Sequence, residues 1–365
     1  MFKKTYILGL VLQMLFMQAC TKAPLTLVKQ KDVASGLKTG FKSNYLGLGS
    51  FVEHENFVFF ALGPRKIAVY DLNKQRIVKR YKLAAQVDSA PYVKDELLFV
   101  ATIKGQVYCI NLKTKKIMWM SDIAEAAIGA VAGDDRFIYI TTAQDSVLAL
   151  DQSSGKQLWK YEKEFYEAKN MTGLWAAPII DLKTKTGQFP LLDGRLIRLN
   201  LENGQVVGEN TEFSESKNEG LSAHKQFNQY VYMSQYKSKA MLKNNESGDI
   251  VWETSNLGTY ALPVLTQEHA YFPLWDGSVE KVNLNTGQVV WTSKVKTNSW
   301  LSMAKYNALL LLSDAKGNTY VLDSNEGKLL WTYKHRRNLI GHPVIYKNKV
   351  FLFTQEGAIY TLKLR

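Results

Sequence analysis

The stretch that decides the fold runs from Gly277 to Val295 and reads GSVEKVNLNTGQVVWTSKV. It predicts two short strands joined by a turn over residues 283–287. The Asn283 side chain can bond to backbone N–H groups further along, and Gly287 can take the positive φ that a bulged hairpin turn requires. Trp291 then places a large ring on the second strand, where it can pack against a neighbouring sheet.

The same hairpin recurs along the whole chain. Its turn begins at Asp71, Asn111, Asp151, Asn200, Asn244, Asn283, Asp323 and Lys363, and the tryptophan position holds Trp119, Trp159, Trp252, Trp291 and Trp331. The spacings between turns are 40, 40, 49, 44, 39, 40 and 40 residues. Two further candidate strands precede each hairpin. A period near forty with four short strands is typical of a β-propeller blade.

The eighth copy is incomplete, because the sequence reaches Arg365 before its last strand could begin. The segment near Leu25 to Lys31 precedes the first blade and can supply that strand. We therefore predict an all-β, eight-bladed propeller of four-stranded antiparallel blades, closed by an N-terminal strand. A seven-bladed ring is the alternative, since the fifth copy has Lys243 where other copies have Leu or Val.

The first residues are typical of a targeting signal and are not expected to be part of the fold. Lys3 and Lys4 precede a short apolar run, and the segment Met17-Gln18-Ala19-Cys20 resembles a bacterial lipoprotein cleavage site. We expect a signal peptide at 1–19, a lipid-anchored linker and closing strand at 20–35, and the propeller at 36–365. Cys20 would carry the lipid anchor, and the outer membrane is the expected location. A plain secretory signal that happens to contain a cysteine is the alternative.

Composition excludes some classes of protein. The only cysteines are Cys20 and Cys109, so lipidation of the first leaves no intramolecular disulfide. The net charge is +13, or +11 without residues 1–19, which favours anionic surfaces. No nucleic-acid motif is present, so no nucleic acid is expected as a partner. The five histidines show no metal-ligand spacing, and most of them are expected to lie at the surface or in loops; they are His54, His224, His269, His335 and His342.

The repeat motif Asp-x-x-x-Gly-x-x-x-Trp, as at Asp151 to Trp159, resembles the tryptophan-docking motif of quinoprotein (PQQ-type) propellers. Within that superfamily, the signal, eight compact repeats and lack of an inserted domain resemble the BamB-type outer-membrane protein assembly factors. The resemblance implies a non-enzymatic scaffold, without cofactor or metal. It would dock on periplasmic domains of the β-barrel assembly subunit as a monomeric propeller, and help to deliver unfolded outer-membrane proteins.

Two long loops, Lys160–Trp175 and Glu209–Gly220, interrupt neighbouring repeats and should emerge on the same rim. In the family, one such loop carries apolar and Arg residues and the next carries acids. The resemblance therefore implies partner-binding residues Met171, Leu174, Trp175, Glu212, Glu215 and Glu219. The first loop contains Lys but no Arg, which departs from the family pattern.

Two other function classes remain open. A quinoprotein dehydrogenase would need Ca²⁺ ligands and usually a vicinal cysteine pair, and the sequence shows no Cys-Cys pair and no obvious metal constellation. A lipoprotein propeller that binds a peptide, a glycan or the cell wall is the other class, because propellers lend their rims to many ligands.

Overall fold

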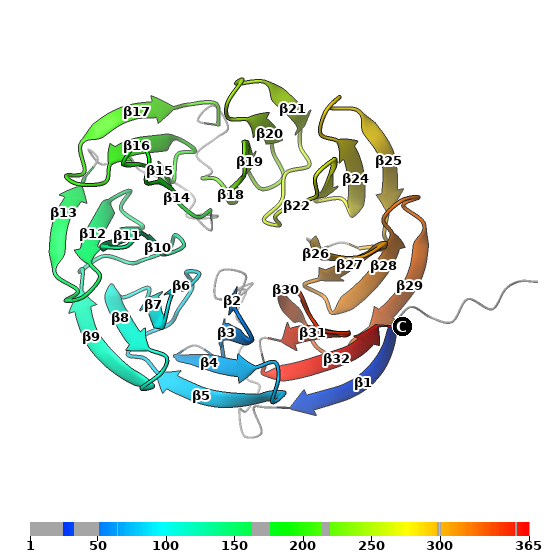
Figure 1. Ribbon diagram of the computed structural model, residues 1–365, viewed down its shortest axis with the longest axis horizontal. Helices are drawn as coiled ribbons and strands as arrows, with labels where there is room; N and C mark the ends of the chain where they lie inside the picture. Colours follow the sequence, from blue (N-terminus) through cyan, green and yellow to red (C-terminus); the bar gives the residue numbers. More distant parts are fainter. Residues whose placement is uncertain are drawn as a thin grey trace, which may run out of the picture.

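A computed structural model describes residues 25–32, 51–63, 65–162, 176–213, 220–297, 299, 301–354 and 356–364, and only the backbone of residues 26–32. Their regular structure consists of eight four-stranded antiparallel sheets arranged as blades around a ring (Figure 1). The prediction of an eight-bladed all-β propeller is therefore confirmed. The seven-bladed alternative is wrong, because the fifth copy forms a full blade despite Lys243.

In blades 1 to 7 the strands run in chain order from the centre of the ring outward. Blades 1 to 4 comprise β2 (Phe51–His54), β3 (Phe57–Ala61), β4 (Lys66–Asp71), β5 (Arg76–Lys82); β6 (Tyr92–Lys94), β7 (Leu97–Ala101), β8 (Gln106–Asn111), β9 (Lys116–Asp122); β10 (Ala132–Gly133), β11 (Phe137–Thr141), β12 (Val147–Asp151), β13 (Gln157–Tyr161); β14 (Ile179–Asp181), β15 (Thr186–Pro190), β16 (Leu196–Asn200) and β17 (Val206–Asn210). Blades 5 to 7 comprise β18 (Ala223–Phe227), β19 (Tyr230–Ser234), β20 (Ala240–Asn244), β21 (Ile250–Thr254); β22 (Val264–Leu265), β23 (His269–Pro273), β24 (Ser278–Asn283), β25 (Val289–Lys294); β26 (Leu301–Tyr306), β27 (Leu309–Asp314), β28 (Asn318–Asp323) and β29 (Leu329–Lys334).

Blade 8 is built from both ends of the chain. It comprises β30 (Leu339–Tyr346), β31 (Lys349–Thr354), β32 (Ala358–Leu364) and, as its outermost strand, β1 (Leu25–Asp32). The pairing of β1 with β32 is antiparallel and places Leu25 opposite Leu364. The predicted closure by an N-terminal strand is confirmed, and it removes the unpaired edge that blade 8 would otherwise carry.

The repeated turn has the chemistry that the sequence predicts. The Asn283 Oδ1 accepts hydrogen bonds from the backbone N–H groups of Asn285 (2.9 Å) and Thr286 (3.1 Å). Gly287 has a φ of 69°, and its N–H donates to the Asn283 carbonyl at 2.9 Å. The register between β24 and β25 shifts between Lys281 and Val282, which is the bulge that such a turn produces.

The tryptophans join neighbouring blades, as the packing interpretation of the motif requires. Trp159 on the outer strand of blade 3 donates its indole N–H to the Leu201 carbonyl of blade 4 at 2.9 Å. Its ring covers Gly204, the turn glycine of blade 4, so closely that a Cβ there would lie 2.6 Å from the ring. The turn glycines Gly155, Gly204 and Gly327 are each covered in this way by the tryptophan of the preceding blade, so these three positions require a residue without a side chain.

Burial on both sides of the inner strands makes the blades mutually dependent. Val279 and Val282 point to opposite faces of β24, and both are fully buried. A blade stabilised on both faces by its neighbours cannot be stable alone. Cys109 is also buried, and burial raises the pKa of its thiol to about 11, which makes it an inert core residue. The prediction of surface histidines is wrong for His224 and His335, because the packed blades bury both rings.

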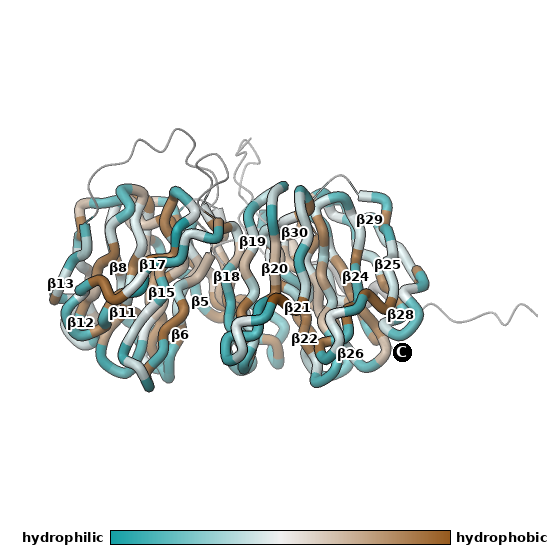
Figure 2. Tube along the Cα trace, turned by 90° about the horizontal axis from the view of Figure 1, so that it is seen from above, coloured by the Kyte–Doolittle hydropathy of each residue, from teal (hydrophilic) through white to brown (hydrophobic). Residues whose placement is uncertain are grey.

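The ring has two distinct faces, seen edge-on in Figure 2. Strands alternate in direction, so the connections between the second and third strands of the blades emerge on the same face as the connections between blades. We call this the loop face and the opposite one the turn face. Hydrogen bonds join the two kinds of connection, as from the Val295 N–H to the Gly277 carbonyl at 3.0 Å. Among the described residues, no helix is long and apolar enough to cross a membrane.

Candidate partner-binding surface

The loop face carries the segments from which both predicted docking loops start. Of the predicted partner-binding residues, Glu212 is described by the structure. The remaining ones, Met171, Leu174, Trp175, Glu215 and Glu219, lie outside the described residues, as does the predicted anchor Cys20. The geometry of this surface therefore rests on Glu212, the flanks of the two loops and the turns of blades 3 to 6 beside them.

The second loop is fastened to blade 5 at its start. The Lys243 ammonium on β20 lies 2.9 Å from the Glu212 carboxylate. Burial opposes ionisation of Glu212, but the hydrogen bond and charge of Lys243 outweigh it and hold the pKa of Glu212 below its usual range. The next residue, Phe213, is buried, and its carbonyl accepts a hydrogen bond from Gln235 Nε2 at 2.7 Å. The loop thus leaves the ring from a fixed position.

The first loop begins at a second ion-pair network. Lys160 near the end of β13 contacts the carboxylates of both Glu125 and Glu162. Glu125 is buried and accepts a hydrogen bond from Thr142 Oγ1 at 2.6 Å. Burial opposes ionisation of Glu125, but its hydrogen bonds, that from Lys160 first, lower its pKa. Lys160 is therefore engaged within the ring, although it belongs to the loop that the sequence singled out.

Arg195 supplies the guanidinium that the first loop lacks. It lies in the turn before β16, where its side chain contacts Asp193 and, at 2.8 Å, Glu209. The neighbouring Asp145 is buried and accepts a hydrogen bond from the Leu192 N–H at 2.7 Å, linking blade 3 to blade 4. Burial raises the pKa of Asp145 to about 6, against the effect of that bond. Asp145 and Asp193 both lie in the turn before the third strand of their blade, and the sequence analysis did not single out the adjacent Arg195.

An aromatic cluster continues this face over blades 5 and 6. The rings of Tyr236 and Tyr260 stack at 4.4 Å, and Trp275 meets Tyr236 edge-on at 4.6 Å. The Lys237 ammonium lies 4.3 Å from the centre of the Trp275 ring, a cation–π contact. Sequence reasoning missed this cluster. The signal was present, because Tyr236 and Trp275 occupy the same turn, between the second and third strands, in two successive blades.

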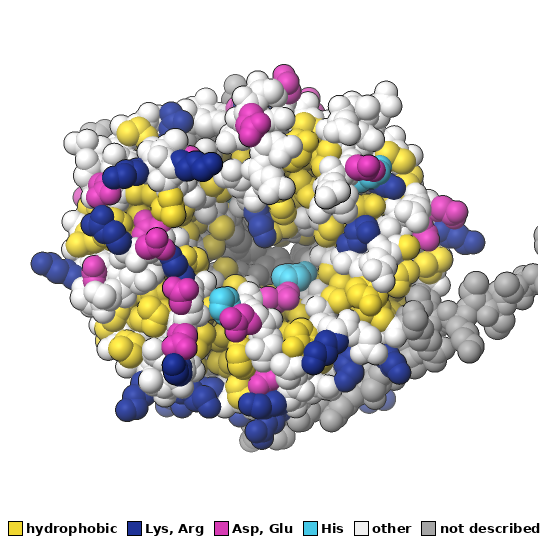
Figure 3. All heavy atoms as spheres, viewed as in Figure 1, with side chains coloured by type: hydrophobic (Ala, Val, Ile, Leu, Met, Phe, Trp, Pro, Cys, Tyr) yellow, Lys and Arg dark blue, Asp and Glu magenta, His cyan; other side chains and the backbone are white. Residues whose placement is uncertain are grey.

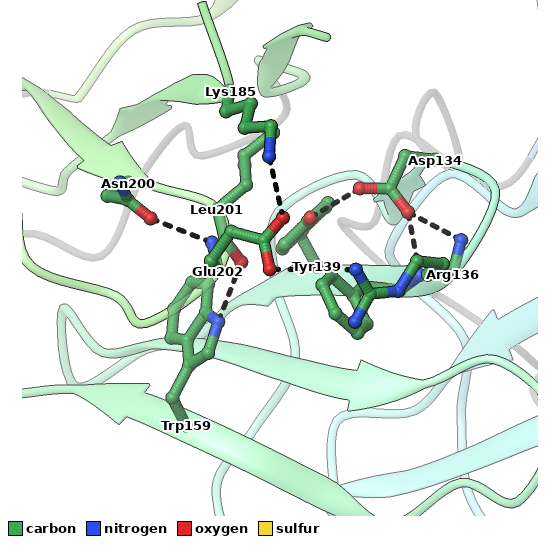
Figure 4. A network of polar contacts seen from close by, with 9 residues as sticks. Asp134, Arg136, Tyr139, Trp159, Lys185, Asn200, Leu201 and Glu202 are labelled. Carbon is green, nitrogen blue, oxygen red and sulfur yellow. Dashed lines mark hydrogen bonds and ion pairs between the residues drawn. The ribbon is translucent and has the colours of Figure 1, made fainter.

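The turn face carries a different polar network at the junction of blades 3 and 4 (Figure 4). Glu202 there lies 3.5 Å from both Arg136 and Lys185. The Tyr139 hydroxyl donates to the Asp134 carboxylate at 2.6 Å. Beside this network lies a groove of about 590 Å³, lined by Leu97, Asp135, Arg136, Phe137, Asp151, Gln152, Ser153, Leu158 and Glu202. This groove lies on the face opposite the two long loops.

The chemistry on the loop face is that of binding. Arginine and half-buried aromatic residues are the residue types that anchor protein interfaces, and this face carries both together with ion pairs. Among the residues that the structure describes, no group of three or more His, Cys, Asp or Glu is placed to hold a metal ion.

The sequence also matches the model of a known protein family. The family model described as outer membrane protein assembly factor BamB matches residues 63–293 and 275–364, which together make up most of the chain.

Individual relatives are distant. The outer membrane protein assembly factor BamB of Shewanella oneidensis is 22% identical over 77% of this chain and 61% of its own length. The protein of the same name from Yersinia pestis is 19% identical over 72% of this chain and 68% of its own length. An uncharacterised protein of Rickettsia conorii is 26% identical, and the chain spans 42% of that relative's length.

Solved structures share the fold. BamB from Moraxella catarrhalis superposes with a TM-score of 0.72 at 15% identity, covering 93% of this chain and all of that one. A quinohemoprotein alcohol dehydrogenase from Pseudomonas putida gives a TM-score of 0.70 at 12% identity, covering 94% of this chain and 76% of the other. At such identities the likeness concerns the fold alone.

Proposed function

Because the chain belongs to the family of outer membrane protein assembly factor BamB, we propose that it is a non-enzymatic scaffold for assembling proteins into the outer membrane. The observation that carries this proposal is the family match over most of the chain. The eight-bladed ring supports it, since a rigid ring can present one wide face to a partner. No cofactor or metal is part of the proposed role.

The loop face of blades 3 to 6 is the proposed docking surface for periplasmic domains of the barrel-inserting subunit. Arg195 and Glu212 supply charge, and the cluster around Tyr236 supplies aromatic area. We propose that Met171, Leu174, Trp175, Glu215 and Glu219 in the two long loops complete it. In this role the propeller works as a monomer within a complex, and its outer strands assist unfolded outer-membrane proteins by pairing with them.

The proposed location is the periplasmic side of the outer membrane, with Cys20 as the lipid anchor. Several acyl chains on one residue give stable anchoring where a single chain is marginal. Replacing Cys20 by Ser is expected to release the protein from the membrane fraction and to remove its acyl modification. Retention of the variant in the membrane with its acyl groups would contradict the anchor.

Affinity purification of the chain from membranes solubilised in mild detergent tests the docking role. We expect the barrel-inserting subunit to co-purify and to be identified by mass spectrometry. The variants Arg195→Glu, Trp175→Ala and Glu215→Arg should each reduce its recovery severalfold. Arg136→Glu is the matched control, because Arg136 is an exposed arginine in an ion pair on the turn face. Undiminished recovery with all three loop-face variants would mean that another surface binds the partner.

A glycan or peptide ligand is the second candidate, and the aromatic cluster favours it. The stacked rings of Tyr236 and Tyr260 beside Trp275 offer flat apolar area next to a cation. Tyr236→Ala should then abolish binding of cell-wall fragments in a pull-down, whereas the docking role predicts that the same variant weakens recovery of the barrel-inserting subunit. A dehydrogenase is tested by adding pyrroloquinoline quinone with Ca²⁺, since a bound-quinone absorption band would contradict the non-enzymatic role.

A further inference from the structure

Charge is distributed unevenly around the ring. Residues 301–364, 25–32 and 51–82, which form blades 7, 8 and 1, contain 18 Lys and Arg against 8 Asp and Glu. Residues 128–297, which form blades 3 to 6 with their connections, contain 17 Lys and Arg against 20 Asp and Glu. The positive excess of the chain is therefore concentrated on one side of the ring, which we call the basic sector.

The outer strand of blade 1 is the centre of this sector. Strand β5 reads RIVKRYK, with four cations and no acid, and Lys79 takes the position that tryptophan holds in other blades. Arg76 and Lys82 are exposed. Among the residues that the structure describes, no carboxylate forms an ion pair with Arg76, Lys79 or Lys82. In Figure 3, Lys and Arg side chains gather along the edge over β4, β5 and β32.

Two cations on the acidic side of the ring are paired with neighbouring carboxylates. Arg195 contacts Asp193 and Glu209, and Lys185 lies 3.5 Å from Glu202. Such cations are neutralised within the ring and contribute little to its external field. Arg76, Lys79 and Lys82 of β5 remain available to an external anion.

The chain enters the ring beside the basic sector. Strand β1 begins at Leu25, on the turn face of blade 8 beside blade 7, and its other end points toward blade 1 (Figure 1). Five residue steps separate Leu25 from Cys20, and five extended residues span at most about 18 Å. A lipid on Cys20 would therefore hold this part of the basic sector within about 18 Å of the bilayer surface.

We propose that the basic sector rests on anionic phospholipid headgroups, so that the ring stands with blades 8 and 1 toward the membrane. Juxtamembrane Lys and Arg are attracted to anionic headgroups within about a Debye length, so the lipid tether and the charge act on the same edge. Blades 4 and 5 lie across the ring from blades 8 and 1 (Figure 1), so these two blades would stand away from the bilayer. This orientation rests on the proposed lipid anchor, and it leaves the loop face of blades 3 to 6 open to a periplasmic partner.

Two fluorescent probes at equivalent turns test the orientation. Asn348→Cys lies in the turn before β31 in blade 8, and Thr184→Cys lies in the corresponding turn of blade 4; both residues are exposed. The full chain is purified in detergent, labelled with an environment-sensitive dye, and reconstituted into vesicles of phosphatidylethanolamine and phosphatidylglycerol. The dye at residue 348 should brighten at least twofold and the dye at residue 184 should not. Equal responses of the two dyes would overturn the proposal.

A matched pair of charge reversals tests the cause. Arg76→Glu with Lys347→Glu alters the basic sector, and Lys156→Glu with Lys183→Glu makes the same charge change at equivalent positions in blades 3 and 4. The first pair should abolish the response at residue 348, since each lost cation lowers partitioning roughly fivefold. The second pair should leave it intact. The proposal would also be overturned if the dye at residue 348 still brightened in the first pair of variants, in 0.5 M NaCl, or on neutral phosphatidylcholine vesicles.

Labelling of the parent chain separates this proposal from the proposed function. Cys109 is buried, so dye incorporated by the parent chain would report an unmodified Cys20. That outcome would contradict the lipid anchor, and the basic sector would then be tested by salt-sensitive flotation of the same charge-reversal variants with phosphatidylglycerol vesicles. Loss of the barrel-inserting subunit from the pull-down, with the probe response retained, would contradict the docking role and leave the orientation standing.

Discussion

The junction between blades 3 and 4 and the junction between blades 8 and 1 complete the same ring by different means. At the first, Trp159 covers Gly204 and donates a hydrogen bond to the Leu201 carbonyl. At the second, which we call the closing junction, Phe353 packs against Phe51 and Phe60 at ring distances of 5.4 and 5.1 Å. One junction uses the repeated motif, and the other uses a cluster of phenylalanines.

The difference shows what the tryptophan motif requires. A docked tryptophan needs the turn glycine that joins the last two strands of the next blade. The closing junction has neither partner, because β1 reads LTLVKQKD and the turn of blade 1 holds Gln75 in place of the glycine. The junction of blades 7 and 8 lacks the turn itself, because the last two strands of blade 8, β32 and β1, come from opposite ends of the chain. Trp331 of blade 7 accordingly packs in a cluster that contains Leu25 and Leu364 from the two ends. Closure by strand exchange thus replaces a local contact by a long-range one.

The largest expected effect comes from emptying the closing junction. Phe353→Ala removes a fully buried ring and should lower the free energy of unfolding by about 3–5 kcal/mol. Trp159→Ala should cost about the same, because its ring is also buried. Urea denaturation of both variants, with Val290→Ala as an exposed control, checks this. A loss below about 1 kcal/mol for Phe353→Ala would mean that the phenylalanine cluster does not hold the ring closed.

The pH dependence of stability should follow two buried histidines, one between blades 4 and 5 and one between blades 7 and 8. The Nδ1 atom of His224 contacts the Ala177 carbonyl in the segment before blade 4, and the His335 ring packs against Tyr360 of blade 8. Burial lowers the pKa of each to about 4, aided at His335 by the charge of Lys334. The unfolded chain takes up a proton below about pH 6.5 and the folded one only below about 4. Each histidine therefore costs stability as pH falls from 6.5 to 4, by up to about 3 kcal/mol.

Replacing one histidine checks this sign. His335→Gln should flatten the fall in unfolding free energy between pH 6.5 and 4, measured by denaturation at several pH values. Asp145 acts in the opposite direction, because burial raises its pKa to about 6 and the folded chain then holds a proton that the unfolded chain releases. Asp145→Asn should accordingly steepen the fall. Parallel pH profiles for the parent and both variants would contradict the assignment.

Three glycine substitutions, with smaller expected effects, separate the cost of a contact with an aromatic ring from the cost of the backbone conformation. Gly204 and Gly341 have positive φ, and a Cβ at either would lie within 2.8 Å of an aromatic ring. Gly248 has the same kind of φ, but a Cβ there would meet no atom within 4 Å. Gly248→Ala should cost about 1–2 kcal/mol for the backbone alone. The other two alanine variants should cost about 1–3 kcal/mol more, by thermal or urea unfolding.

Equal losses at the three glycines would show that the rings move aside without cost, and the two junctions would then share no packing constraint. A greater loss at Gly204 than at Gly341 would show that the indole is the more rigid partner.

The smallest effect is expected at the ion pair that fastens the second long loop. Glu212→Gln should lower the free energy of unfolding by about 1 kcal/mol or less, since both side chains of the pair with Lys243 are partly exposed. A double-mutant cycle with Lys243→Met, repeated in 0.5 M NaCl, measures the coupling. A coupling well above 1 kcal/mol would mean that the loop start contributes to folding as much as to docking.

Much of this fold follows from the sequence, because a propeller repeats one local unit. The turn at Asn283, the glycine at 287 and the ring at Trp291 are short-range features, so spacing alone identifies the blade. Closure was also predictable, since the eighth copy lacks a strand and one segment near the N-terminus remains to supply it. The same reasoning failed for His335, whose burial depends on a neighbouring blade and not on its own strand.

The candidate site was less predictable than the fold. The sequence singled out the two long loops, and of the residues named in them Glu212 is the one that the structure places, in an ion pair with Lys243. Arg195 and the rings of Tyr236, Tyr260 and Trp275 escaped notice, because each sits in a turn or connection that looks ordinary within its own repeat. They gather only because turns of successive blades emerge side by side on one face.

The sequence by itself determined the repeat, the number of blades and the strand that closes the ring, because hydrogen bonding and alternation within a hairpin are local. The tertiary structure alone decided which side chains from different blades share a face, which histidines are buried, and where the cations collect. The physical reason is the curvature of the ring, which places residues hundreds of positions apart, such as Phe51 and Phe353, in one junction. It also places the entry of the chain at Leu25 and the cationic strand β5 on either side of blade 8.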